Sequence, residues 1–93
     1  KHMASMTYPN NNRTFILTWE GMSFKGKEID LLIDENGEKK KIGSIVSKEE
    51  LDNGKEFDHN GSKIHVQYKK VFAFIKELSL EVDGVKVKGQ SLQ

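Results

Sequence analysis

The stretch that decides the fold is residues 55–69, KEFDHNGSKIHVQYK, in which two alternating runs of polar and apolar residues flank Asn60-Gly61. A tight turn of the primed type needs positive φ, which an Asn-Gly pair adopts at low cost. Centring a two-residue loop on this pair places Phe57 opposite Ile64. A slip of one residue would place Lys63 against Phe57, so the pattern specifies the hairpin and its register.

Three more dipeptides of this kind divide the chain into short runs: Asn36-Gly37, Asn53-Gly54 and Asp83-Gly84. At Asp83-Gly84 a two-residue loop pairs Val82 with Val85, and the neighbouring pairs are also chemically favourable. The chain is therefore predicted to be a stack of antiparallel hairpins.

The register at Asn36-Gly37 has two solutions. A two-residue loop places Leu31 opposite Ile42, whereas a four-residue loop places Ile29 there. Both keep apolar side chains on one face of the sheet, so the alternation does not choose between them.

Two segments need separate treatment. Residues 47–53 begin with the Ser-x-x-Glu spacing of a capping box and end at Asn53-Gly54, which predicts one turn of helix between two sheets. Residues 71–82 fit both a helical stripe and a strand. The hairpin at Asp83-Gly84 favours a strand, and a bulge near Ile75-Lys76 would explain its broken alternation.

These elements predict an all-β fold, namely an antiparallel β-sandwich or small barrel of seven to eight strands with at most one short helical turn. The 93 residues suit a single domain. We expect residues 1–12 to be a tag remnant, with Met6 as the native start, and a disordered lead-in; residues 13–89 form the domain and residues 90–93 a frayed tail. The predicted core residues are Phe15, Leu17, Trp19, Ile29, Leu31, Ile33, Phe57, Ile64, Val66, Tyr68, Leu78, Leu80 and Val82.

Composition narrows the classes of function. The chain has no cysteine, which removes disulfides and thiolate chemistry and favours an intracellular, cytoplasmic protein; a secreted protein without its signal peptide is the alternative. No apolar run approaches the ~18 residues that span a bilayer, so we predict no membrane partner. The net charge is +1 with both signs interspersed, which gives no general attraction to nucleic acid.

Catalytic and metal-binding patterns are weak. Acidic residues fall at outward strand positions and hairpin tips, where solvation keeps carboxylates ordinary. Residues 34–38 match only a fragment of a calcium loop, and the hairpin register sends His59 and His65 to opposite faces, which argues against zinc. We therefore predict a non-enzymatic protein with no catalytic residue, metal or cofactor.

The most suggestive feature is a set of apolar residues out of phase with their strands: Ile16, Leu32 and Ile75. If their strands are adjacent, these side chains make an exposed patch of the kind that marks interaction surfaces. We predict a protein-interaction or assembly module that binds a protein partner or itself, through this patch or an unpaired sheet edge.

The alternative is a small barrel that binds single-stranded nucleic acid or glycan, with lysines and aromatic side chains on one face. Two expectations argue against it. Glu56, Asp58 and Glu81 should neutralise Lys63 and Lys86, and the aromatic side chains, including Phe72 and Phe74, should point inward.

Residues 54–57, 63–68 and above all the closing hairpin at residues 78–87 resemble the β-sandwich of the Fas apoptotic inhibitory molecule family. The resemblance covers about half the chain, which has the length of one domain where the family has two and lacks the family's cysteines. It implies a non-enzymatic sandwich that acts through protein contacts, in cell survival or protection against aggregation. It carries over no functional residue.

Overall fold

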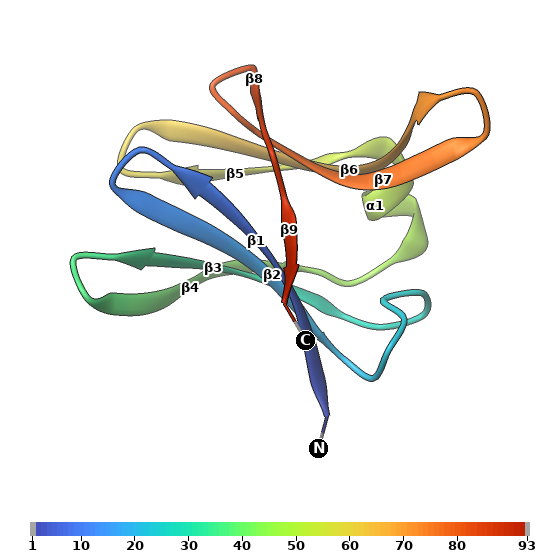
Figure 1. The fold of residues 1–93 in the computed structure, drawn as a ribbon, viewed down its shortest axis with the longest axis horizontal. Coiled ribbons are helices and arrows are strands. Elements are labelled where there is room, and N and C mark those ends of the chain that lie inside the picture. The colour runs from blue at the N-terminus through green and yellow to red at the C-terminus, as the bar shows by residue number, and fades with distance from the viewer. Residues whose placement is uncertain (1, 93) are drawn as a thin grey trace.

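The computed structural model describes residues 2–92, which form an antiparallel β-sandwich (Figure 1). The predicted all-β class is confirmed. Nine strands occur in the described residues, against the predicted seven to eight, together with one short helix. The elements are β1 (Met3–Asn10), β2 (Arg13–Glu20), β3 (Ile29–Glu35), β4 (Glu38–Ile45), α1 (Lys48–Asn53), β5 (Lys55–His59), β6 (Ser62–Phe72), β7 (Ile75–Val82), β8 (Val85–Val87) and β9 (Gln90–Leu92).

The two sheets have strand orders β4-β3-β2-β1-β9 and β5-β6-β7-β8. Three of the four Asn-Gly and Asp-Gly dipeptides make the predicted hairpin turns, with positive φ at both residues. The register of the β5–β6 hairpin is confirmed by the pairing of Phe57 with Ile64, and that of the closing hairpin by the pairing of Val82 with Val85. The fourth dipeptide ends α1 instead, since the Gly54 N–H donates to the Glu50 carbonyl at 2.9 Å.

The open register at Asn36-Gly37 resolves to a two-residue loop with a bulge beyond it. Glu35 pairs with Glu38, but the register shifts between Leu31 and Leu32, so Leu31 lies opposite Gly43 rather than Ile42. Gly43 is required there because a Cβ at this position would lie 2.8 Å from the Phe57 ring. The glycine thus leaves room for an aromatic side chain of the opposite sheet.

The expectation that residues 1–12 form a disordered lead-in is wrong for the strand β1. This strand pairs with β2 along its whole length, from Met3 opposite Glu20 to Asn10 opposite Arg13. Its alternation of Ala4 and Tyr8 with polar neighbours supplies an inward face, and both side chains are buried. Lys1 lies outside the described residues.

The frayed tail expected at residues 90–93 is likewise wrong for residues 90–92, which form β9 and pair with β1. Gly89 precedes this strand and lies against the Tyr8 ring, where a Cβ would come within 2.6 Å of a ring carbon. The chain can therefore turn across Tyr8 only with glycine at this point. Gln93 lies outside the described residues.

The core lies between the two sheets. Every predicted core residue is buried except Tyr68, which is partly buried. Further buried apolar side chains that were not predicted come from β1, β4, α1 and β8: Ala4, Tyr8, Ile45, Leu51 and Val87. The Tyr8 hydroxyl donates a 2.5 Å hydrogen bond to the Leu78 carbonyl in the opposite sheet.

The prediction of one continuous strand over residues 71–82 is wrong. The strand β6 runs on to Phe72, the chain turns at Ala73 and Phe74, and β7 begins at Ile75. Ala73 has φ 49°, and a register shift lies between Lys70 and Phe72. The bulge predicted near Ile75-Lys76 is therefore replaced by a register shift between Lys70 and Phe72 and by the turn that follows it.

We predict that Gly84→Val lowers the free energy of unfolding by more than about 1 kcal/mol, because a β-branched residue resists positive φ. Gly84 has φ 83°, and an added Cβ would meet nothing within 4 Å, so the backbone conformation alone is tested. Urea unfolding measures the change. Gly84→Asn is the matched control and should lose much less; equal losses would contradict this assignment of the turn.

We predict that Tyr8→Phe lowers the free energy of unfolding by about 1–3 kcal/mol, because the buried Leu78 carbonyl loses its donor. The control is Tyr68→Phe, since the Tyr68 hydroxyl makes no hydrogen bond within residues 2–92. That control should change stability by less than about 0.5 kcal/mol. Equal changes in the two variants would mean that the bond from β1 adds nothing to the domain.

Candidate functional site

The structure brings together two of the three residues of the predicted interaction surface. Ile16 on β2 and Leu32 on β3 are cross-strand partners on the outer face of the five-stranded sheet. Ile16 is only 8% exposed and Leu32 is partly buried. Ile75 begins β7 in the other sheet. The three residues therefore do not form one patch.

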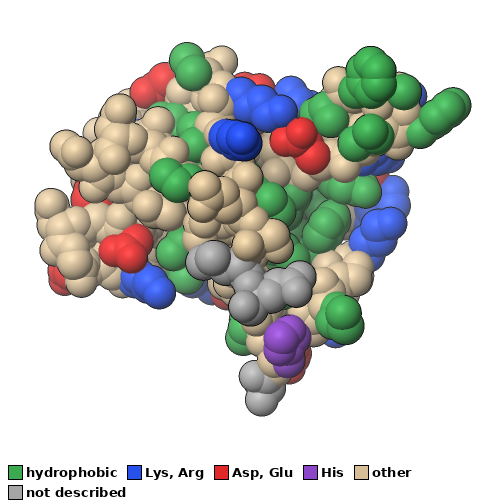
Figure 2. Space-filling view, in the orientation of Figure 1, with side chains coloured by type: hydrophobic (Ala, Val, Ile, Leu, Met, Phe, Trp, Pro, Cys, Tyr) green, Lys and Arg blue, Asp and Glu red, His purple; other side chains and the backbone are tan. Residues whose placement is uncertain are grey.

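Ile75 belongs instead to an exposed apolar hairpin end, which we call the apolar tip and define as Val71, Phe72, Phe74 and Ile75. Phe74 is 95% exposed, Phe72 73% and Ile75 59%. The inward orientation expected for the two phenylalanines is wrong, because the turn at Ala73 carries the run away from the core. Figure 2 shows hydrophobic side chains gathered at this corner of the molecule, over the β6–β7 hairpin.

A cleft is lined by residues of the β6–β7 hairpin, of the connection between β2 and β3, and of the helix α1. Figure 1 shows that these three segments lie at the same end of the sandwich. Its volume is about 320 Å³. The walls are largely apolar, and four lysines line it from three parts of the chain. The apolar lining residues are Phe24, Ile29, Ile45, Leu51 and Tyr68, and the lysines are Lys25, Lys27, Lys48 and Lys76. We call this feature the lysine-rimmed cleft.

An aromatic series holds the connection at residues 21–28 against the core. The Phe24 ring contacts Trp19 and Tyr68 edge to face, with centroids 5.6 and 5.0 Å apart. The Trp19 indole N–H donates to the Met22 carbonyl at 3.4 Å. This connection is therefore anchored by ring packing, and it forms one wall of the cleft.

The charges around the cleft are unequally compensated. Lys48 pairs with Asp52 at 2.5 Å. This hydrogen bond raises the pKa of Lys48 and lowers the pKa of Asp52. Among the described residues, Lys25, Lys27 and Lys76 have no carboxylate within ion-pairing distance. Lys76 is near enough to Asp52 to help lower the pKa of that carboxyl, and its Nζ lies 5.3 Å from the centre of the Tyr68 ring. No Asp or Glu among residues 2–92 lines the cleft, so its rim has excess positive charge.

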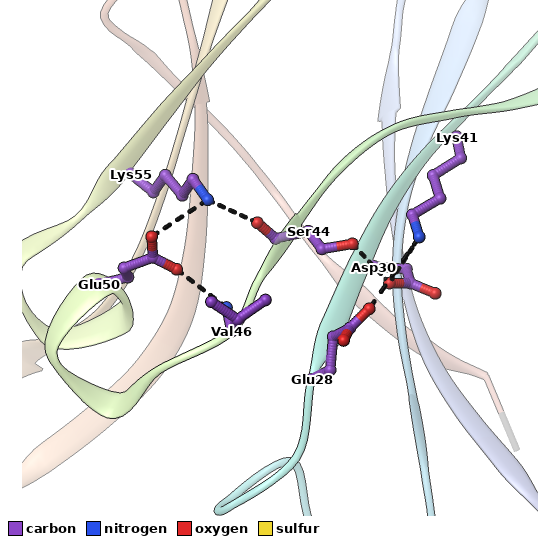
Figure 3. Close-up of polar contacts among 7 residues, drawn as sticks. All are labelled: Glu28, Asp30, Lys41, Ser44, Val46, Glu50 and Lys55. Carbon is purple, nitrogen blue, oxygen red and sulfur yellow. Dashed lines mark hydrogen bonds and ion pairs between the residues drawn. The ribbon is translucent and has the colours of Figure 1, made fainter.

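Polar contacts fix α1, which forms another wall of the cleft (Figure 3). Ser47 caps the helix as predicted, because its hydroxyl accepts from the Glu50 N–H at 3.1 Å. The Glu50 carboxylate accepts from the Val46 N–H at 2.9 Å and pairs with Lys55 at 3.2 Å. Lys55 also donates to the Ser44 carbonyl at 2.7 Å. The helix is thus tied to both strands that it joins.

Histidine and acidic side chains do not converge. In the part of the chain that the structure describes, no three His, Asp or Glu side chains are grouped so as to hold a metal ion. His59 lies 3.5 Å from Glu35, and His65 lies 3.2 Å from Gln67. The helix α1 has six residues, and within residues 2–92 no helix has the length and apolarity to cross a membrane.

Comparison of the chain with protein-family models, curated proteins and solved structures gives no match.

Sequence reasoning missed the cleft and the apolar tip for different reasons. The sequence of residues 21–28 indicates only a link between two strands, and nothing local shows that Phe24 packs on Tyr68 across the sandwich. The tip had a visible signal. Five consecutive apolar residues, at 71–75, cannot all face the core from one strand, and lysines flank them on both sides.

We predict that Glu50→Gln removes a pH-dependent part of the stability. Hydrogen bonds from the Val46 N–H and Lys55 lower the pKa of Glu50 in the folded chain. The wild type should therefore exceed the variant in stability above pH about 4.3, the ordinary value for a glutamate, and lose this advantage as the pH falls through the folded pKa. Urea unfolding over a pH series measures the difference.

Glu49→Gln is the matched control, because Glu49 lies in the same turn and its carboxylate makes no hydrogen bond or ion pair among residues 2–92. A wild-type advantage over Glu50→Gln that persists unchanged at acid pH would contradict the role given to this carboxylate.

Proposed function

We propose that this domain is a non-enzymatic protein-interaction module and that the apolar tip is its contact surface. The observation that carries the proposal is the exposure of Phe72 and Phe74, at 73% and 95%, beside exposed Val71 and Ile75. Contiguous apolar side chains on a small domain mark interaction sites. Aromatic side chains also supply much of the binding energy at protein interfaces. Of the three residues of the interaction surface predicted from the sequence, Ile75 belongs to the apolar tip.

The sheet edges offer a weaker site. The edge strand β4 exposes Lys39, Lys40 and Lys41 in succession, and a row of lysines discourages the addition of a strand from another chain. The other edge strands, β5, β8 and β9, have only five, three and three residues. The outer-face pair Ile16 and Leu32 offers little area, because Ile16 is already covered.

The alternative is binding of single-stranded nucleic acid or glycan, and one observation favours it: Phe72 and Phe74 are exposed near Lys70 and Lys76. Base stacking on aromatic rings beside lysines is the usual mode of such binding. Ion pairs reduce the available charge, however. Lys63 pairs with Asp58, Lys69 with Glu81, and Lys86 with Glu77. We therefore rank this function second.

The resemblance of residues 54–57, 63–68 and 78–87 to the Fas apoptotic inhibitory molecule family implies the same class of function. We keep that relationship as a proposal, together with a cytoplasmic location. The proposal for the apolar tip does not rest on this resemblance, because the exposure of Phe72 and Phe74 supports it directly.

We predict that Phe72→Ser with Phe74→Ser abolishes association while changing the free energy of unfolding by less than about 0.5 kcal/mol, because exposed side chains contribute little to stability. Light scattering over a range of protein concentrations tests self-association. For a separate partner, a photo-crosslinking phenylalanine analogue at position 74 should capture a protein in the cell of origin.

The matched control places the same analogue at Val85, which is 68% exposed at another hairpin end. The expected result is an adduct from position 74 and none from position 85. Adducts from both positions, or from neither in a protein that also stays monomeric, would contradict the proposal. Binding that falls steeply with salt would favour nucleic acid instead.

A further inference from the structure

We propose that the lysine-rimmed cleft binds a small amphipathic anion, namely an aliphatic monocarboxylate whose chain enters the cleft and whose carboxylate stays at the lysines. The site differs from the apolar tip and goes beyond the proposed function. The segments that line the cleft lie at the end of the sandwich opposite to the Asn-Gly and Asp-Gly hairpin turns (Figure 1).

The walls of the cleft select an apolar group. Ile29 and Ile45 are each 1% exposed and Leu51 is 7% exposed, so the cleft reaches down to core side chains. Phe24 and Tyr68 complete the apolar lining. Ligand pockets in proteins typically start at about 300 Å³, and this cleft has a volume of about 320 Å³. It therefore suits one short chain rather than a large cofactor.

The rim selects a negative charge. Lys25 and Lys27 come from the β2–β3 connection and Lys76 comes from β7, so the three ammonium groups approach the cleft from both sheets of the sandwich. Within residues 2–92 none of them has a carboxylate within ion-pairing distance, and Asp52, which acts on Lys76 from further away, is already paired with Lys48. A carboxylate would replace these missing partners. Charge-assisted bonds of this kind gain strength beside a low-dielectric wall.

The shape of the site agrees with an apolar interior and a positively charged rim. Figure 2 shows a hollow below the β6–β7 hairpin in which hydrophobic side chains are visible, with Lys or Arg side chains at its border. Lys76 already lies over the Tyr68 ring, with 5.3 Å between Nζ and the ring centre. Its ammonium group therefore lies beside an aromatic wall of the cleft.

Trp19 provides a built-in reporter. It is the one tryptophan of the chain, and its ring lies 5.6 Å from that of Phe24, which lines the cleft. A ligand that displaces Phe24 should change the Trp19 fluorescence. The probe is octanoate, titrated into the full chain and followed by this fluorescence and by calorimetry. The expected result is saturable binding of one octanoate, with weaker binding of octan-1-ol and octyltrimethylammonium.

The test variant carries Lys25→Gln, Lys27→Gln and Lys76→Gln, all at exposed positions. Losing one charge-assisted contact should weaken octanoate binding by at least about tenfold, and octan-1-ol binding should not change. The control variant removes the same charge at Lys39, Lys40 and Lys88, none of which lines the cleft. It should bind octanoate as the wild type does.

Three outcomes would overturn the proposal: no saturable binding of octanoate, equal binding of the cationic and anionic probes, or equal weakening in the test and control variants. The Phe72→Ser, Phe74→Ser protein separates the two sites. It should keep octanoate binding, and binding that disappears in it but survives in the lysine variant would assign the probe to the apolar tip. Absence of octanoate binding would overturn the proposal for the cleft and would not bear on the interaction role of the apolar tip.

Discussion

The buried hydrogen bond from the Tyr8 hydroxyl to the Leu78 carbonyl joins the two sheets across the apolar core that lies between them. It joins β1 in one sheet to β7 in the other, across 70 residues of sequence, and Tyr8 is only 1% exposed. The β7–β8 pairing ends at Leu80 and Val87, so Leu78 lies beyond it and its carbonyl can accept from a side chain. Burial raises the pKa of Tyr8, which keeps the hydroxyl a donor. Gly89 then allows the chain to cross the ring and form β9.

The two ends of the sandwich differ in chemistry. One end carries the turns at Asn36, Asn60 and Asp83, where polar side chains and positive φ close the hairpins. The other end carries the β2–β3 connection, α1 and the β6–β7 hairpin (Figure 1). This second end combines the apolar tip with the lysine-rimmed cleft. Both functional proposals therefore concern one end of the molecule, where the connections leave apolar surface without a covering element.

Local sequence was sufficient wherever two neighbouring strands are joined by a short turn. The pairing of Phe57 with Ile64 and of Val82 with Val85 follows from turn chemistry and alternation, because both partners lie within a few residues of the turn. The helix α1 was also predictable, since Ser47 and Glu50 cap it through local bonds. By contrast, β1 was missed although it alternates. The turn at Asn11 that joins β1 to β2 lacks the glycine that marks the other hairpins.

The sequence by itself determined the all-β class, the main hairpins and most of the core, because these depend on interactions between residues close in the chain. Only the tertiary structure decided which surfaces are available for binding. Ile16 and Leu32 are neighbours in one sheet and Ile75 lies in the other, because strand order is set by the packing of whole sheets. The cleft likewise needs Phe24, Leu51 and Tyr68, which approach one another only when the two sheets close over a common core. Contacts between residues so far apart in the sequence form only when the whole domain folds, so no local sequence pattern predicts them.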